Sequence, residues 1–177
     1  MIASLKNIRS RLRDPQLTER AWFNGLWFQS LWFTCVLGRE AWLPLAMTLL
    51  LIHLLLVRST LDEITSIAPV AALGVCIDTS LSLGGVFDFG PSTTPAWLAL
   101  LWLGFAAALP RALAWFGAHP WRAAVTGAAA VPLNYLAGAR MGAVSLPYGE
   151  TTTWVILAAV WALLMPLCYR LGLPKTA

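Results

Sequence analysis

Long apolar runs, separated by short polar or turn-forming segments, dominate the chain from residue 21 onward. Each run approaches the roughly 20 residues that a helix needs to cross a bilayer, and Gly, Pro or charged residues stand between consecutive runs. The pattern predicts about six transmembrane helices, near residues 21–38, 42–57, 64–87, 95–116, 121–144 and 152–169. The alternative is five, with the weakly hydrophobic third or fifth run re-entrant.

A different pattern precedes the first run. Apolar residues recur at helical spacing at Ile2, Leu5, Ile8 and Leu12, and a lysine and arginines lie between them. This spacing predicts a short amphipathic helix that lies on the headgroup surface. The expected organisation is therefore all-α: a basic N-terminal arm over residues 1–20, followed by a single transmembrane helical domain over residues 21–177.

Composition supports a membrane protein over a soluble or disordered one. Hydrophobic residues make up 59% of the chain and charged residues only 11%, whereas soluble domains carry about 25% charge. The net charge of +4 is concentrated in the arm before the first run. Because the arm flanks a membrane segment, anionic lipid headgroups are its expected partner, and no nucleic-acid partner is expected.

The distribution of basic residues predicts the orientation. Ten of the 12 lysines and arginines fall in the arm or in connections that the six-span topology places on the same side. Cytoplasmic segments carry such an excess of positive charge. Both termini are therefore predicted to be cytoplasmic.

Four polar residues form a predicted polar layer within the membrane. Gln29, Asp78, Asn134 and Tyr135 lie in the first, third and fifth spans, which run parallel, at roughly 14 Å from the outer interface. Arg140 lies about a turn and a half above Asp78 in depth, so an Asp78–Arg140 contact is also expected. Such residues either bind a ligand or fix the packing of the helices.

A second polar set is predicted near the inner face: Asn24, His53 and Arg111. His53 can act as a proton carrier, a ligand or a base. Arg111 follows Pro110, so its guanidinium either binds a backbone carbonyl that the proline frees or reaches the inner headgroups. Asp78 and His53 are the candidate catalytic residues, each with a purely structural role as the alternative. Whether the protein is an enzyme is left open.

The sequence gives no reason to expect a metal or a cofactor. Cys35, Cys76 and Cys168 lie far apart within apolar runs and show no metal-ligand spacing. They are interpreted as buried thiols that behave as small hydrophobic residues. The motifs of hydrolases, metalloproteases and phosphate-binding loops are missing from the sequence.

Several of these residues carry a resemblance to a known family. The chain, from Trp22 to Leu171, resembles a proteobacterial inner-membrane family catalogued only as a domain of unknown function. The resemblance rests on the runs 27–38 and 134–143 together with His53 and Asp78. It implies a small multi-pass protein of the bacterial inner membrane. It also implies genes nearby for cyclopropane-fatty-acid-synthase-like methyltransferases and flavin-dependent oxidoreductases, and hence a role in lipid modification or membrane stress.

The leading hypothesis is therefore an accessory protein of membrane lipid modification or stress response that binds a lipid or an acyl intermediate. Membrane lipids and membrane-associated lipid-modifying enzymes are the expected partners. One alternative is a small-molecule transporter or its substrate-binding subunit, although the first span is bulkier than the small-residue stripe typical of such subunits. A non-catalytic scaffold for partner enzymes is the other.

Overall fold

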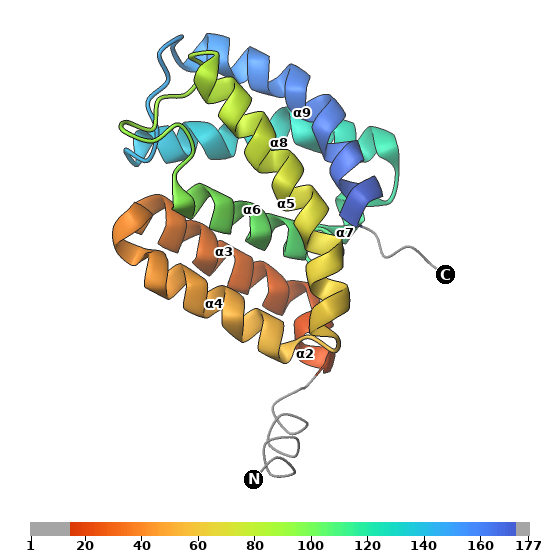
Figure 1. Ribbon diagram of the computed structural model, residues 1–177. Coiled ribbons are helices and arrows are strands. Elements are labelled where there is room, and N and C mark those ends of the chain that lie inside the picture. The colour runs from red at the N-terminus through yellow and green to blue at the C-terminus, as the bar shows by residue number, and fades with distance from the viewer. Residues whose placement is uncertain (1–14, 173–177) are drawn as a thin grey trace.

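The computed structural model describes residues 15–172 (Figure 1), and the amphipathic helix predicted in the N-terminal arm lies outside this range. The described part is all-helical apart from an isolated bridge between Asp88 and Ser145. Its α-helices are α2 (Pro15–Glu19), α3 (Ala21–Gly38), α4 (Leu43–Leu56), α5 (Thr60–Leu83), α6 (Ala96–Ala108), α7 (Ala114–Gly117), α8 (Pro120–Arg140) and α9 (Glu150–Gly172), and a 3-10 turn, η1 (Arg39–Trp42), joins α3 to α4.

Each of the six apolar runs forms a helix, but the bounds of α5 and α6 differ from the prediction. α5 begins earlier because the Ser59 hydroxyl accepts a hydrogen bond from the Asp62 amide at 3.4 Å and so caps the first turn. It ends before residue 87 because Gly85 adopts a φ of +75°, which terminates a helix. α6 ends at Ala108, well short of residue 116, because Pro110 cannot donate the next helical hydrogen bond.

The helices form two groups that α5 connects. α3 packs between α4 and α6 in one group, and α8 packs along α9 in the other, as the most extensive helix pair of the molecule. α5 contacts both α6 and α9 and crosses the molecule diagonally between the groups (Figure 1).

Three connections gather at one end of the bundle, which we call the Arg39 end: η1, residues 84–95 and residues 141–149. The Arg39 guanidinium donates to the Gly142 carbonyl at 2.9 Å, and the Ala96 amide donates to the Glu40 carboxylate at 3.0 Å. The Tyr148 hydroxyl donates to the Gly84 carbonyl at 2.8 Å. These hydrogen bonds hold the three connections together.

The opposite end, which we call the Arg111 end, holds α2, the α4–α5 turn, residues 109–119 and the last turn of α9. There the Arg111 guanidinium contacts Glu19 of α2 at 3.0 Å, and the Tyr169 hydroxyl donates to the Leu113 carbonyl at 2.6 Å. The first and last described helices therefore lie at the same end, which requires an even number of passes along the bundle.

Three segments are long and apolar enough to cross a membrane: 21–56, 60–83 and 150–172. Large apolar side chains are exposed on the outside, among them Leu163, which is 78% exposed. α6 is shorter, at 13 residues, and lies in the interior with Trp97, Trp102 and Ala107 buried. An apolar exterior around a packed interior is expected when lipid is the solvent. The exact number of six crossings remains a prediction.

Two glycines allow close approach at the centre of the fold. A Cβ on Gly74 of α5 would overlap the Trp102 ring, and a Cβ on Gly127 of α8 would overlap the Trp161 carbonyl of α9. Small residues at helix contacts let backbones approach closely in membrane proteins. Gly74 thereby places Trp102 against α5, and Gly127 brings Trp161 of α9 close to α8.

Candidate functional site

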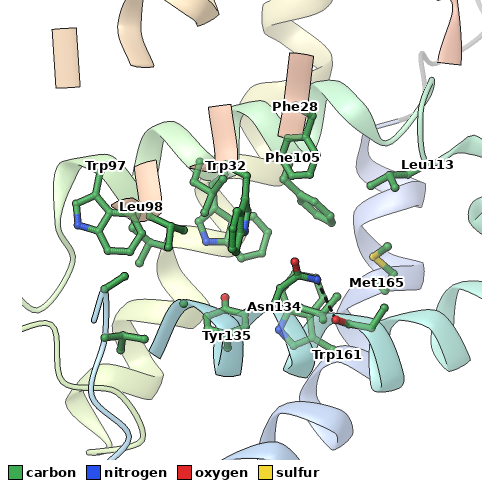
Figure 2. A pocket seen from close by; sticks show the side chains of 18 of the residues that line it. Phe28, Trp32, Trp97, Leu98, Phe105, Leu113, Asn134, Tyr135, Trp161 and Met165 are labelled. Atoms are coloured by element: carbon green, nitrogen blue, oxygen red, sulfur yellow. Dashed lines mark hydrogen bonds between the residues drawn. The ribbon is translucent and has the colours of Figure 1, made fainter. Parts of the chain in front are cut away.

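A cavity of about 220 Å³ lies between the two helix groups (Figure 2). It is lined mainly by apolar and aromatic side chains that come from both groups and from the Arg39 end. The aromatic residues among them are Phe28, Trp32, Phe89, Trp97, Trp102, Phe105, Phe116, Tyr135 and Trp161. Apolar walls with a few polar groups are typical of ligand sites, although this cavity is smaller than the roughly 300–1,000 Å³ usual for drug-sized ligands.

The cavity is elongated along the helix axes. On α8 its lining includes Thr126, Ala130, Asn134 and Gly138, which recur every four residues along one face and span about 18 Å. A matching stripe of Phe28, Trp32 and Val36 lines it from α3. The cavity therefore has the shape of a lengthwise channel between helices.

One side of this channel opens on the flank of the bundle. Ala130 and Asn134 line the cavity and are nevertheless exposed. They lie within α8, away from both ends of the helix. Gly138 is buried but also has open space beside it, since a Cβ placed there would meet no atom within 4 Å apart from its chain neighbours and its own helix backbone. An entry at this position faces sideways, toward the acyl region of a bilayer around the protein.

Asp78 lies behind the cavity wall and is fully buried, with an exposed fraction of 0%. Its carboxylate accepts hydrogen bonds from the Trp102 indole at 2.8 Å and from the Tyr135 hydroxyl at 2.8 and 2.9 Å. Both donors line the cavity, whereas Asp78 itself does not. Tyr135 is held further by Phe87, whose ring stacks on it at 4.9 Å. Asp78 thus fixes two rings of the wall from behind.

The structure brings together only part of the predicted polar layer. Tyr135 contacts Asp78, but the neighbouring Asn134 points into the cavity and donates to the Ala130 carbonyl at 2.9 Å. Gln29 is exposed on the outer face of α3. The expected Asp78–Arg140 contact is not formed: Arg140 pairs with Glu150 at 2.8 Å on the surface. Residue number fixes depth along a helix, but rotation about the helix axis separates these side chains.

Two members of the predicted inner-face set, His53 and Arg111, meet at a residue that sequence reasoning missed, Glu63. The Glu63 carboxylate lies 2.8 Å from His53 Nε2 and accepts two hydrogen bonds from the Arg111 guanidinium, at 2.9 and 2.8 Å. Glu19 also binds Arg111, at 3.0 Å. We call Glu19, His53, Glu63 and Arg111 the Glu63 cluster. It joins α2, α4, α5 and the segment after α6.

Several contacts hold the Glu63 cluster rigid. The His53 ring stacks on Trp27 at 4.3 Å, and Asn24 accepts a hydrogen bond from the Ala112 amide at 3.4 Å. Arg111 also donates to the Ala107 carbonyl at 3.2 Å beside Pro110. The guanidinium therefore binds a backbone carbonyl and the Glu63 carboxylate, but this carbonyl belongs to Ala107 and not to Ala106, whose helical hydrogen bond Pro110 removes.

The carboxylates of Glu63 and Glu19 keep the Arg111 guanidinium protonated. Desolvation would lower the pKa of this guanidinium, but the hydrogen bonds and charges of Glu63 and Glu19 outweigh that effect and raise its pKa above the ordinary value. Arg111 is therefore a permanent cation within the cluster. Its side chain is 10% exposed and that of Glu63 is 7% exposed, so the pair is largely sealed from solvent.

A pattern in α5 could have pointed to Glu63. Glu63, Ile67, Gly74 and Asp78 recur at helical spacing and face the interior together. Asp62 is explained by the cap with Ser59, but Glu63 shares the face of Asp78 and has no such local explanation. The predicted third span begins at residue 64, so Glu63 falls just outside it, whereas α5 begins at Thr60 and includes Glu63 on its interior face.

The cysteines do not form a site. Cys35 and Cys168 are buried, as interpreted from the sequence, but Cys76 is exposed, because it lies on the outward face of α5 where apolar side chains meet lipid. Within residues 15–172 no group of three or more His, Cys, Asp or Glu side chains is placed to hold a metal ion. We therefore take the aromatic cavity as the candidate ligand site.

Helical secondary structure, three long apolar segments and an apolar exterior define a polytopic helical membrane protein. Residues 21–167 match the family model described as "Protein of unknown function (DUF2878)", so the chain belongs to this family. No curated protein and no solved structure matches the chain.

Proposed function

We propose that this protein binds a lipid or an acyl intermediate of the membrane in the aromatic cavity between α3, α6 and α8. The observation that carries the proposal is the shape of the cavity, an apolar channel along the helix axes with an opening on the flank of the bundle. A ligand that already resides in the bilayer can enter sideways without crossing water. A volume of about 220 Å³ suits one chain better than a whole lipid molecule.

The placement of reactive groups favours binding over catalysis. Both candidate catalytic residues lie outside the lining: Asp78 is behind the wall, and His53 belongs to the Glu63 cluster at the Arg111 end. Tyr135 is the only titratable residue of the lining, and its hydroxyl is engaged by Asp78. We therefore propose an accessory role that holds or presents a chain, in lipid modification or membrane stress response, to membrane-associated lipid-modifying enzymes.

The same proposal includes the cellular setting. We propose a bacterial inner membrane, with both termini cytoplasmic, on the basis of the excess of basic residues in the arm and in the connections at the Arg111 end. The first and last described helices, α2 and α9, both reach that end, which is consistent with termini on one side.

Two neighbouring alanines test the proposal. Ala130 lines the cavity and Ala129 does not, while both are exposed on α8. Native mass spectrometry of the purified protein should detect a retained lipid or fatty acid in the wild type and in Ala129→Leu. Ala130→Leu narrows the opening and should lose the ligand while keeping the thermal stability of the control. A wild-type protein free of lipid, together with equal binding of an added fatty acid by both variants, would refute the proposal.

A further inference from the structure

We infer that the ligand carries a carbonyl-type oxygen at the middle depth of the membrane, which accepts a hydrogen bond from the indole N–H of Trp161. This inference rests on the proposed function and narrows the class of ligand. A plain hydrocarbon chain gains little free energy when it leaves lipid for an apolar cavity, because both surroundings are equally apolar. Selective binding therefore needs a polar contact inside the cavity.

Trp161 supplies an unused donor at this place. The residue lines the cavity and is only 2% exposed, yet its Nε1 has no hydrogen-bond partner among the described residues. Figure 2 shows Trp161 on the same side of the cavity as Asn134. A buried donor without a partner carries an uncompensated desolvation cost, so native structures rarely keep one without a reason.

Of the four other buried indoles among the described residues, those of Trp102 and Trp27 have hydrogen-bond partners. Trp102 stacks parallel to Trp161, with ring centroids 5.3 Å apart and an interplanar angle of 3°, and its N–H binds Asp78 at 2.8 Å. Trp27 donates to the Leu49 carbonyl at 3.0 Å. The fold thus satisfies the indole on one side of the stack and leaves the other, in a residue that lines the cavity, without a partner among the described residues.

Depth determines which oxygen can reach this donor. Trp161 lies midway along α9, roughly 16 Å from either end. The ester oxygens of an ordinary phospholipid lie at the interface, about half a hydrocarbon thickness away. The acceptor must therefore belong to a molecule whose oxygen lies deep in the bilayer. Two sources share this chemistry: an acyl chain with a mid-chain ketone, and a quinone-type ring attached to an apolar tail.

Three added ligands separate these possibilities in the purified protein: octadecanoate, its mid-chain keto analogue, and a quinone with a saturated tail. We expect the wild type to bind the keto acid or the quinone roughly five- to tenfold more tightly than octadecanoate, which is the effect of one well-placed hydrogen bond. Calorimetry or displacement of a labelled fatty acid gives the affinities. The more tightly bound of the two oxygenated ligands identifies the source.

Trp161→Phe keeps an aromatic ring in the stack and removes only the N–H. It should abolish the preference for the oxygenated ligand and leave the affinity for octadecanoate unchanged. Trp154→Phe, in the same helix but outside the cavity lining, should keep the preference. Equal wild-type affinities for all three ligands would overturn the inference while leaving the proposed function standing. Failure of all three to bind would instead contradict the proposed function. The wild-type comparison needs no variant to fold.

Discussion

Arg111 and Glu63 form a bidentate ion pair, with two N···O distances of 2.9 and 2.8 Å, that ties the segment after α6 to the first turn of α5. The pair is nearly sealed from solvent, and its partners lie 48 positions apart in the chain. Since a planar guanidinium matches a carboxylate with two parallel hydrogen bonds, this contact fixes both distance and orientation at the Arg111 end.

We expect Arg111→Gln to destabilise the protein by about 3 kcal/mol, because it leaves the buried Glu63 carboxylate without its cation. Arg111→Lys should lose less stability than Arg111→Gln but more than none, since it keeps the charge and loses the bidentate geometry. Thermal unfolding in detergent measures both. The control is Arg140→Gln, which removes the exposed pair with Glu150, and it should leave the melting temperature almost unchanged. Equal losses for Arg111→Gln and Arg140→Gln would contradict the structural role of the Glu63 cluster.

The two glycines of α8 give opposite predictions for the same substitution. Gly127→Ala places a methyl group against the α9 backbone and should cost about 2 kcal/mol through overpacking. Gly138→Ala adds the same group where no atom lies within 4 Å. It should be neutral or stabilise by up to about 1 kcal/mol through helix propensity. Thermal unfolding in detergent measures the change in stability of both variants. A loss at Gly138 as large as that at Gly127 would contradict the open space assigned to the cavity.

The helices were predictable from the sequence because apolar runs and turn residues are local signals. Even the errors have local causes: the cap at Ser59 and the proline at position 110 shift the ends of α5 and α6. The side-chain partners were less predictable. Asn134 and Tyr135 are adjacent, but successive residues of a helix point about 100° apart, so one faces the cavity opening and the other reaches Asp78.

The cavity itself had no signature in the sequence. Its aromatic lining comes from α3, α6, α7, α8, α9 and the connection 84–95, and aromatic residues are common throughout this chain. Only packing shows which of them face a shared space. Glu63 was missed for a related reason: its partners, His53 of α4 and Arg111 in the segment after α6, lie in other parts of the chain. Depth and residue type narrowed the candidates, and the rotation of each helix about its axis decided among them.

The orientation of the chain is open to a direct test. Reporter fusions after Arg58, Arg122 and Lys175 should report the cytoplasm, and fusions after Arg39, Pro91 and Tyr148 should report the periplasm, because six crossings alternate the sides of successive connections. A paired alkaline phosphatase and fluorescent-protein reporter gives a positive signal on either side. If two neighbouring fusions report the same side, no helix crosses the membrane between them, and the six-span topology is contradicted.

Asp78 offers the sharpest separation between a structural and a proton-transferring role. In Asp78→Asn the amide oxygen can still accept from the Trp102 indole, and the amide nitrogen can donate to the Tyr135 hydroxyl oxygen. If Asp78 only fixes the cavity wall, this variant should keep the stability of the wild type to within about 1 kcal/mol. Asp78→Leu should lose about 3 kcal/mol, because it strands both donors in an apolar interior.

Complementation of a deletion strain, scored together with thermal stability in detergent, completes the test of Asp78. Because Arg140 pairs with Glu150 at the surface, Asp78→Asn strands no buried cation, so a loss of stability cannot arise from that source. A stable Asp78→Asn protein that binds octadecanoate and complements fully would fit a residue that positions Trp102 and Tyr135. A stable variant that binds the chain but fails to complement would contradict this purely structural role, because only the titratable proton and the charge have been removed.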